Sequence, residues 1–194
     1  MENSDKPIFE CSNLLFGYGT PLTQDLSFTL SPGQVAFIKG ANGSGKTTLI
    51  HTILGKKNAL GGSYKWNIDK SFVSYLPQMT NPNSNFSFTV TEIFDFYDIP
   101  EERKSLLPKD LFKKRWIDMS GGEKQKVMLL TRLTKNIKVL ILDEPFNHLD
   151  RDSINSLSEL LTKLVSGNDP LSLLLVSHLE VCFPSEILKQ VELQ

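Results

Sequence analysis

Three short, uninterrupted apolar runs constrain the fold of this chain more than any other feature. They read "QVAFIKG", "KVLILDE" and "SLLLVSH" and begin at Gln34, Lys138 and Ser172. Each run ends abruptly in a glycine, an acid or a histidine. Runs of this length are typical of strands buried on both faces, the usual state of a parallel sheet covered by helices. They are far shorter than the ~20 apolar residues that cross a bilayer.

Segments with helical periodicity alternate with these strands. "KTTLIHTILG" gathers its apolar residues on one side and ends at Gly55, a plausible C-terminal stop. "RDSINSLSELLTKLV" carries a clear apolar stripe. Thr89 and Glu92 have the spacing of a capping box, which predicts a helix start. Strands that alternate with helices indicate an α/β fold with a mainly parallel sheet.

Two segments interrupt this alternation. Residues 56–76 are interpreted as short antiparallel strands around a "GG" turn. Earlier in the chain, "LSFTL" at 26–30 alternates apolar and polar residues like a strand with one solvated face. Residues 79–118 are polar, punctuated by proline and helical in places. We therefore predict one domain over residues 1–194: an α/β core with a mainly parallel sheet, a small antiparallel β subdomain, and a short inserted α-helical subdomain at 79–118.

The charge and the cysteines argue against several classes of partner and site. The net charge of −1 comes from 21 basic and 22 acidic residues, so no overall field would hold a polyanion. Nucleic acid is therefore unlikely as the main partner. Cys11 and Cys182 lack the spacing of a zinc site or a disulfide framework, which fits a reducing compartment. The first ten residues, "MENSDKPIFE", do not resemble an export signal.

The segment "GANGSGKTT" fits the phosphate-loop pattern G-x-x-x-x-G-K-[ST] and lies between a buried strand and an amphipathic helix. Such a loop turns backbone N–H groups around phosphate oxygens, and the helix start adds its positive dipole end. Lys46 would neutralise the β- and γ-phosphates, and the Thr47 hydroxyl would ligate Mg²⁺. The expected nucleotide-binding residues here are Gly40, Asn42, Gly43, Ser44, Gly45, Lys46, Thr47 and Thr48.

Polar side chains end the other two buried runs. Asp143 and Glu144 follow "VLIL", and His178 follows "LLLVS". One carboxylate can hold Mg²⁺ through water while its neighbour orients or deprotonates the water that attacks the γ-phosphate. Parallel sheets place their ligand sites at the carboxyl ends of their strands, so we expect these groups to meet the phosphate loop.

Two adjacent glycines open the helix-like stretch "MSGGEKQKVMLL". Each glycine costs a helix about 1 kcal/mol relative to alanine. Ser120 and Glu123 have capping-box spacing, which accounts for the helix start but not for Gly121 and Gly122. We interpret both glycines as bare backbone that approaches a phosphate.

In this order, the motifs resemble those of the nucleotide-binding subunit of ABC (ATP-binding cassette) ATPases. The chain resembles a single minimal cassette of this family. Many NTPases share the other motifs, and "MSGGE" is the stretch that narrows the choice among them to this family. The resemblance implies ATP and Mg²⁺ as ligands. It also implies that Tyr18 stacks on adenine, with Phe16 as a rival, and that Gln78 senses Mg²⁺ and the attacking water. Glu144 matches the catalytic carboxylate and His178 the switch histidine.

The same resemblance assigns residues to a second subunit. Ser120, Gly121, Gly122 and Glu123 match the signature that binds the ATP of the opposite cassette, and Asp150 in "FNHLD" matches the D-loop. Met119 and Glu123 replace the commoner Leu and Gln, but Ser-Gly-Gly is intact. ATP binding would close a dimer, and hydrolysis would reopen it. We expect the second cassette and integral membrane transporter subunits as partners, and a cytoplasmic protein peripheral to the inner face of the membrane.

Two other functions stay open. A soluble ABC ATPase acting on ribosomes or nucleic acid is favoured by "NHLD", which is similar to the D-loop of translation-factor ABC proteins. The basic cluster Lys109, Lys113, Lys114 and Arg115 could touch RNA, lipid head groups or an acidic helix, or be a solvated face. A small-molecule kinase of the phosphate-loop class would share the phosphate loop. That function would explain neither Ser-Gly-Gly nor the loop that contains Gln78.

Overall fold

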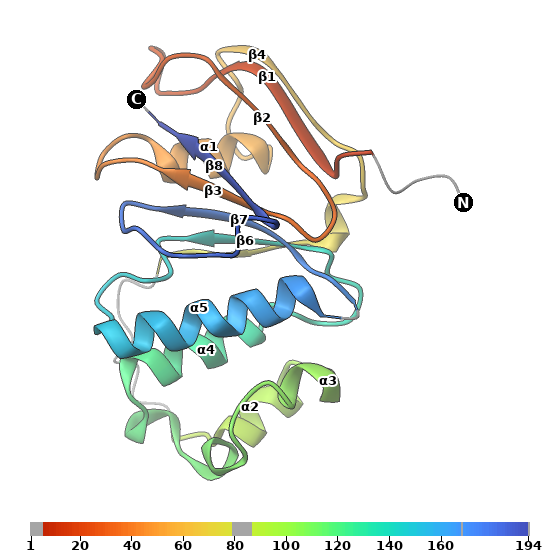
Figure 1. The fold of residues 1–194 in the computed structure, drawn as a ribbon, viewed down its shortest axis with the longest axis vertical. Coiled ribbons are helices and arrows are strands. Elements are labelled where there is room, and N and C mark those ends of the chain that lie inside the picture. The colour runs from red at the N-terminus through yellow and green to blue at the C-terminus, as the bar shows by residue number, and fades with distance from the viewer. Residues whose placement is uncertain (1–5, 79–86, 168, 194) are drawn as a thin grey trace.

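A five-stranded parallel sheet organises the chain in the computed structural model, which describes residues 6–78, 87–167 and 169–193. The strand order is β5-β6-β7-β3-β8, and all neighbouring strands are parallel. Their carboxyl ends share the left-hand edge of the sheet in Figure 1. The strands are β3 (Val35–Lys39), β5 (Val73–Leu76), β6 (Val139–Asp143), β7 (Ser172–Ser177) and β8 (Leu188–Glu192).

The three apolar runs of the sequence are β3, β6 and β7, next to one another at the centre of the sheet. All residues of β6 and β7 are buried, as are the first four of β3. Successive side chains of a strand point to opposite faces, so alternate residues of each run enter two separate cores. The prediction of a parallel sheet buried on both faces is confirmed.

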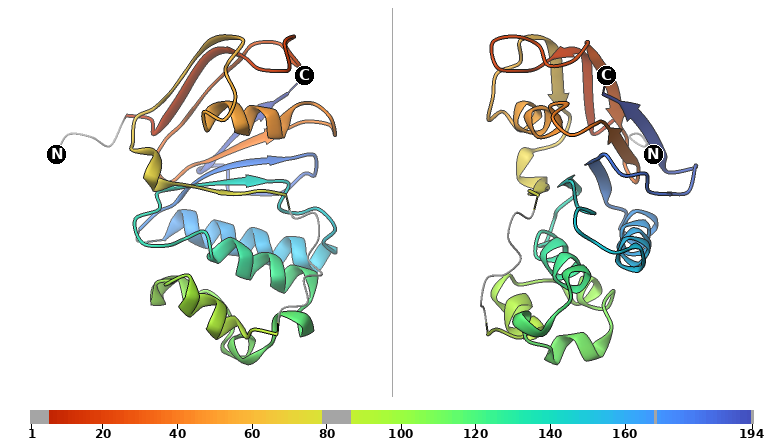
Figure 2. Two further views of the ribbon diagram at one scale, coloured as in Figure 1. Left: turned by 180° about the vertical axis from the view of Figure 1, so that it is seen from behind. Right: turned by 90° about the vertical axis from the view of Figure 1, so that its left-hand side faces the viewer.

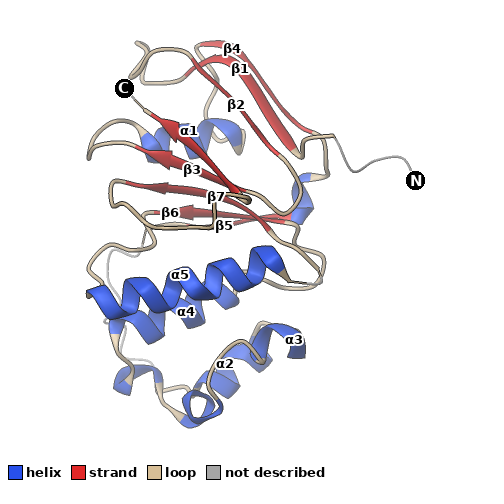
Figure 3. Cartoon of the chain, viewed as in Figure 1, coloured by secondary structure: helices blue, strands red, loops and turns tan. Residues whose placement is uncertain are grey.

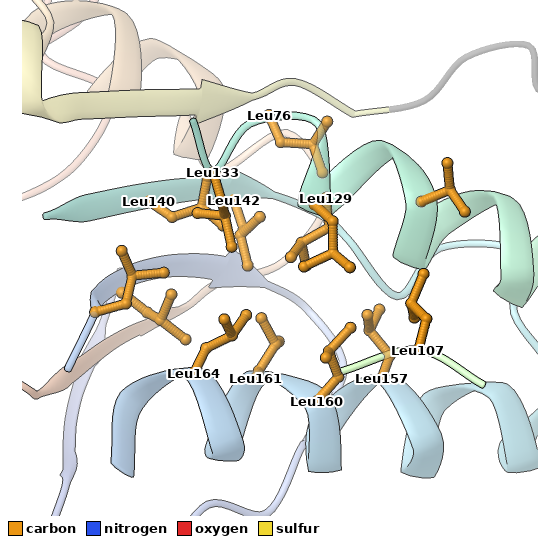
Figure 4. Packing of buried hydrophobic residues seen from close by; sticks show 14 of the residues in the cluster. Leu76, Leu107, Leu129, Leu133, Leu140, Leu142, Leu157, Leu160, Leu161 and Leu164 are labelled. Carbon is orange, nitrogen blue, oxygen red and sulfur yellow. The ribbon is translucent and has the colours of Figure 1, made fainter. Parts of the chain in front are cut away.

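Two helices cover one face of this sheet: α4 (Gly121–Leu130) and α5 (Arg151–Ser166). Figure 4 shows leucines of α5 packed against leucines of β6 and α4. The buried leucines of α5 recur at helical spacing, and its apolar stripe therefore faces the sheet. Those labelled in the figure are Leu157, Leu160, Leu161 and Leu164.

The other face is covered by α1 (Lys46–Ile53) and by an antiparallel sheet of order β2-β1-β4 (Figure 3). Those strands are β1 (Phe9–Leu15), β2 (Leu26–Leu30) and β4 (Gly61–Trp66). The interpretation of residues 56–76 was therefore wrong in part. After η1 (Lys70–Phe72), β5 joins the parallel sheet beside β6, because its four residues continue the parallel ladder from Val73 to Leu76.

The inserted segment contains short helices joined by turns in the part that the structure describes, and residues 79–86 of the expected insertion lie outside the described residues. It lies beyond α4 and α5, on the side away from the sheet, in every view of Figures 1 and 2. The capping box of Thr89 and Glu92 is present. Its elements are α2 (Val90–Phe96), α3 (Glu101–Lys104), η2 (Lys109–Lys113) and η3 (Trp116–Asp118).

Across the described ranges of the chain, we find no helix with the length and apolar character that a membrane crossing requires.

Candidate active site

The phosphate loop connects β3 to α1 and depends on its glycines. Gly43 and Gly45 have φ values of +83° and +90°, in the left-handed region that favours glycine. A Cβ on Gly40 would lie 2.5 Å from Ser44 Oγ and 3.1 Å from Leu193 Cβ, so a side chain there would displace the Ser44 hydroxyl. Ser44 Oγ is buried without a hydrogen-bond partner among the described residues, and Asn42 is exposed. The loop therefore holds a free hydroxyl that suits a phosphate oxygen.

Lys46 is 5% exposed, and its ammonium group is fully engaged. Nζ donates to the carbonyl oxygens of Gly40 at 2.7 Å and Ala41 at 2.8 Å. It also forms an ion pair with Glu144 Oε1 at 2.9 Å. An ammonium has three N–H donors, so these contacts use all of them. A phosphate can therefore bind Lys46 only by replacing one of these partners.

Glu144, 7% exposed, joins the ends of the three central strands. Its Oε1 meets Lys46, while Oε2 lies 3.0 Å from His178 Nδ1 and accepts a bond from Ser177 Oγ at 3.3 Å. Its backbone has φ +48°, which a residue with a side chain rarely adopts. The Glu144 N–H nevertheless donates to the Val176 carbonyl oxygen at 2.9 Å. The structure thus brings together Lys46, Glu144 and His178, which the sequence placed at separate strand ends.

Asp143 and Thr47 form an oxygen-rich corner beside this group. Thr47 Oγ1 donates to Asp143 Oδ2 at 2.8 Å, and Tyr75 OH donates to the same oxygen at 3.1 Å. Asp143 Oδ1 is buried and has no hydrogen-bond partner in the part of the chain that the structure describes. Hydroxyl and carboxylate oxygens are the ligands that Mg²⁺ prefers, and a buried, unpaired carboxylate oxygen suits a cation. Thr47 and Asp143 therefore fit a Mg²⁺ site.

Two opposing effects act on the pKa of Asp143. Burial raises it above its ordinary value, and the neighbouring Glu144 carboxylate raises it further. The hydrogen bonds from Thr47 and Tyr75 act in the opposite direction without cancelling the effect of burial. Burial and the nearby Asp143 charge also raise the pKa of Tyr75, so this hydroxyl stays a donor. Tyr75 was not among the site residues expected from the sequence, and the signal that could have indicated it is a polar side chain close to the end of β5.

The two aromatic candidates for adenine stacking differ in exposure. Phe16 is fully buried in the core, whereas Tyr18 is 69% exposed. Tyr18 OH lies 3.4 Å from Thr48 Oγ1, and Lys57 Nζ lies 3.7 Å from the centre of the Tyr18 ring. The Thr48 contact holds the ring near the start of α1, and the Lys57 contact comes from the segment that follows this helix. Of the two aromatics, Tyr18 is the one that presents a ring to a ligand.

The helix α4 begins with the capping box that the spacing of Ser120 and Glu123 predicts. The Glu123 N–H donates to Ser120 Oγ at 3.2 Å, and Glu123 Oε2 accepts from the Ser120 N–H at 2.7 Å. The same carboxylate forms an ion pair with Lys114 Nζ at 2.8 Å. The Glu123 carboxylate thus holds the helix start and ties it to the inserted segment.

The two glycines of this helix have different environments. A Cβ on Gly122 would lie 2.4 Å from Ser153 Oγ and 2.7 Å from Ser153 Cβ, so packing of α4 on α5 requires glycine there. A Cβ on Gly121 would meet Leu149 Cδ2 at an ordinary 3.8 Å. The interpretation that phosphate approach explains both glycines was therefore incomplete. Packing accounts for Gly122, whereas contacts with the other described residues do not account for Gly121.

Gln78 and Asp150 lie apart from the buried carboxylates. Gln78 is exposed and adjoins the residues outside the described ranges. Asp150 is the N-cap of α5, where its carboxylate accepts a bond from the Ser153 N–H at 2.7 Å. The roles proposed for both residues remain predictions.

The two glycines of α4 can be separated by alanine substitution. We expect Gly122→Ala to lower the free energy of unfolding by about 1–3 kcal/mol, because the added methyl group overpacks against Ser153. Gly121→Ala serves as the matched control and should not lower it. The measurement is urea unfolding, and Gly122→Ala should cost less in a Ser153→Gly background than in the wild type, because the double-mutant cycle cancels the cost of the new glycine itself. Equal losses for both alanine variants would contradict the packing argument.

The raised pKa of Asp143 predicts a pH dependence. The native state binds this proton more tightly than the unfolded state, so the contribution of the protonated carboxyl to stability is fully present below the ordinary pKa of 3.8. It is lost as the pH rises through the raised native pKa. We therefore expect the unfolding free energy of the wild type, minus that of Asp143→Asn, to fall with rising pH in that window. Denaturant titrations in EDTA measure it.

Asp150→Asn is the matched control for this measurement. The hydrogen bond from the Ser153 N–H lowers the pKa of Asp150, so its contribution to stability is present above 3.8 and is lost as the pH falls through the native pKa. The difference between wild type and Asp150→Asn should therefore rise with pH, on the acid side. A wild type and an Asp143→Asn variant with parallel pH profiles would contradict the effect of burial on Asp143.

Comparison with known proteins places the chain in a family. The family model described as ABC transporter matches residues 23–147. Among curated proteins, YfmM of Bacillus subtilis, named as an uncharacterized ABC transporter ATP-binding protein, is 36% identical over 90% of this chain and 34% of its own length. The ribosome protection protein VmlR of the same organism is 31% identical over 89% of this chain and 32% of its own. The chain thus spans about a third of the length of these two relatives.

Other similar proteins match this chain over most of their length. The zinc import ATP-binding protein ZnuC of Ehrlichia chaffeensis is 34% identical over 88% of this chain and 74% of its own length. A crystal structure described as the ADP conformation of MJ1267, an ATP-binding cassette of an ABC transporter, has a TM-score of 0.76 at 20% identity. It covers 97% of this chain and 90% of that one, and it shows the same fold. The chain therefore belongs to the ABC transporter family, as an ATP-binding cassette.

Proposed function

We propose that this cassette binds ATP with Mg²⁺, hydrolyses it between two facing cassettes, and thereby energises a membrane transporter. The observation that carries the hydrolytic part is the buried Lys46–Glu144 ion pair, with His178 on the other oxygen of the same carboxylate. A phosphate-binding cation, a carboxylate and a histidine thus converge at the phosphate loop. Attack of water on a γ-phosphate uses a cation on the phosphates and a group that orients or deprotonates the water, and Lys46 and Glu144 are candidates for these two roles.

The contacts of Lys46 suggest how nucleotide prepares the site. The β- and γ-phosphates compete with Glu144 for the Lys46 ammonium, because both are anionic acceptors within reach of the loop. Once Lys46 turns to the phosphates, Glu144 Oε1 is free to accept a proton from the attacking water. Glu144 Oε2 stays held by Ser177 and His178, which fixes the orientation of the carboxylate.

The remaining expected ligands fit around this centre. Thr47 and Asp143 would hold Mg²⁺, which when bound neutralises charge on the phosphates. Ser44 and the backbone N–H groups of its loop would contact phosphate oxygens, and Tyr18 would stack on the adenine ring. Gln78 would report the state of the site to the inserted segment.

The start of α4 supports the proposal of a dimer. Ser120 and Gly121 are exposed, as is Asp150 at the start of α5. Packing against the residues that the structure describes does not require glycine at position 121, and a bare helix start suits the approach of a phosphate. We place that phosphate on the facing cassette, so that each ATP lies between one phosphate loop and the partner's helix start.

Glu144→Gln tests the chemistry. The substitution removes the proton acceptor and the ion pair with Lys46 but keeps the shape of the side chain. We expect ATP binding to persist, hydrolysis to fall by about 10²–10⁴-fold, and an ATP-bound dimer to accumulate in size-exclusion chromatography. Lys46→Ala should instead weaken ATP binding, because it removes a charge that neutralises phosphate. Hydrolysis at the wild-type rate in Glu144→Gln would show that another group is the base.

Transport is the second part of the proposal. It is supported by the match to the ABC transporter family and by the similarity to ZnuC, which is named as a zinc import protein. On this proposal the cassette is cytoplasmic and is held at the inner face of the membrane by integral membrane subunits. We expect an integral membrane protein to co-purify with the tagged cassette from detergent-solubilised membranes. Capture of ribosomes instead, with no membrane protein, would contradict it.

A second candidate is a soluble ABC ATPase that acts on ribosomes. The similarity to VmlR and the sequence "NHLD" favour it. His148 in that stretch is exposed, with φ +63°. Part of the basic cluster that could meet RNA is neutralised, since Lys114 pairs with Glu123 and Arg115 with Asp118. The same co-purification distinguishes the two functions.

A further inference from the structure

We propose that Tyr75 is a positioning residue for the divalent cation of the ATP site and that it acts through Asp143. This inference rests on the proposed function, in which Thr47 and Asp143 hold Mg²⁺. Nothing in the phosphate loop or in the acidic strand end designates Tyr75, which comes from the neighbouring strand β5. Its hydroxyl reaches a carboxylate that lies 68 positions later in the sequence.

The hydrogen bonds of Asp143 are unequally divided between its two oxygens. Oδ2 accepts from Thr47 Oγ1 at 2.8 Å and from Tyr75 OH at 3.1 Å. Oδ1 is buried and unpaired among the described side and main chains. Two donors that converge on one oxygen prevent the carboxylate from rotating about its bond to Cβ. The other oxygen is thereby kept for a cation, which would otherwise compete with protein donors for it.

The orientation of the Thr47 hydroxyl also depends on the fixed position of the Asp143 carboxylate. A hydroxyl has one donor and two acceptor lone pairs, so Thr47 can donate its proton to Asp143 and still offer a lone pair to a cation. Were Thr47 the sole donor to Asp143, a small turn of the carboxylate would redirect that proton. The second bond, from Tyr75, opposes such a turn.

Tyr75 itself is held by contacts that do not involve a ligand. Its ring meets His51 edge to face, with 6.3 Å between ring centres, and Lys56 Nζ lies 5.0 Å from the centre of the ring. The ring is half-buried and packs against the core between α1 and the sheets. In the parallel ladder Tyr75 pairs with Ile141, two residues before Asp143 on β6. The hydroxyl therefore has a fixed position toward the end of that strand.

Tyr75→Phe tests the proposal, because it removes the hydroxyl and keeps the ring contacts with His51 and Lys56. The probe is Mg²⁺, titrated into the full chain with a non-hydrolysable ATP analogue and followed by thermal shift. Loss of a residue that orients a metal ligand typically weakens metal binding 10–100-fold, so we expect the apparent Mg²⁺ dissociation constant to rise by about tenfold. The affinity for the analogue in EDTA should not change.

Tyr64→Phe is the matched control: Tyr64 is also half-buried and packs against the same core, but it lies on β4 and contacts Phe9. It should bind Mg²⁺ like the wild type. An unchanged Mg²⁺ midpoint in Tyr75→Phe, or an equal loss of analogue affinity with and without Mg²⁺, would overturn the proposal. A wild type that binds the analogue but shows no Mg²⁺ response would instead overturn the proposed function, so the two failures are distinguishable.

Discussion

The buried ion pair between Lys46 and Glu144 is the interaction on which the site depends. Removing two charges from water costs several kcal/mol per ion, unless other hydrogen bonds satisfy both groups. Here two carbonyl oxygens of the phosphate loop accept the remaining hydrogen bonds of the Lys46 ammonium. Ser177 and His178 contact the second oxygen of the Glu144 carboxylate. Neither member can leave without a replacement. An incoming anion is such a replacement for Glu144, which makes the resting arrangement receptive to phosphate.

This ion pair exists only because three strand ends meet at one edge of the sheet. The continuous apolar runs made that edge predictable, since a strand buried on both faces has few alternatives to a parallel sheet. They also placed Asp143, Glu144 and His178 at the correct ends of their strands. By contrast, β5 was misassigned because its four residues, "VSYL", mix polar and apolar side chains and are mostly half-buried. Its place depends on pairing with β6, which no local pattern reveals.

The same limit explains two gaps in what the sequence indicated about the site. Tyr75 was missed because its partner Asp143 is distant in sequence and only the parallel ladder brings the two together. Gly122 was assigned to phosphate approach because the sequence alone does not show whether a ligand or a neighbouring helix leaves no room for a side chain at that position. Here Ser153 of α5 excludes it. Local signals such as the capping boxes were predictable because all their atoms come from four consecutive residues.

Ser153 also connects the start of α4, which carries the signature residues, with the start of α5, which carries Asp150. The family resemblance treats these two features separately. Its N–H is held by the Asp150 carboxylate at the start of α5, and its side chain fills the space left by Gly122 at the start of α4. The start of α4 is tied in turn to the inserted segment by the ion pair of Glu123 with Lys114. In the proposed dimer, the surface that approaches the partner's ATP is therefore one packed unit, including both helix starts. A displacement of the inserted segment would then move Gly121 and Asp150 together, because the Glu123–Lys114 ion pair and the Ser153 contacts join the three elements.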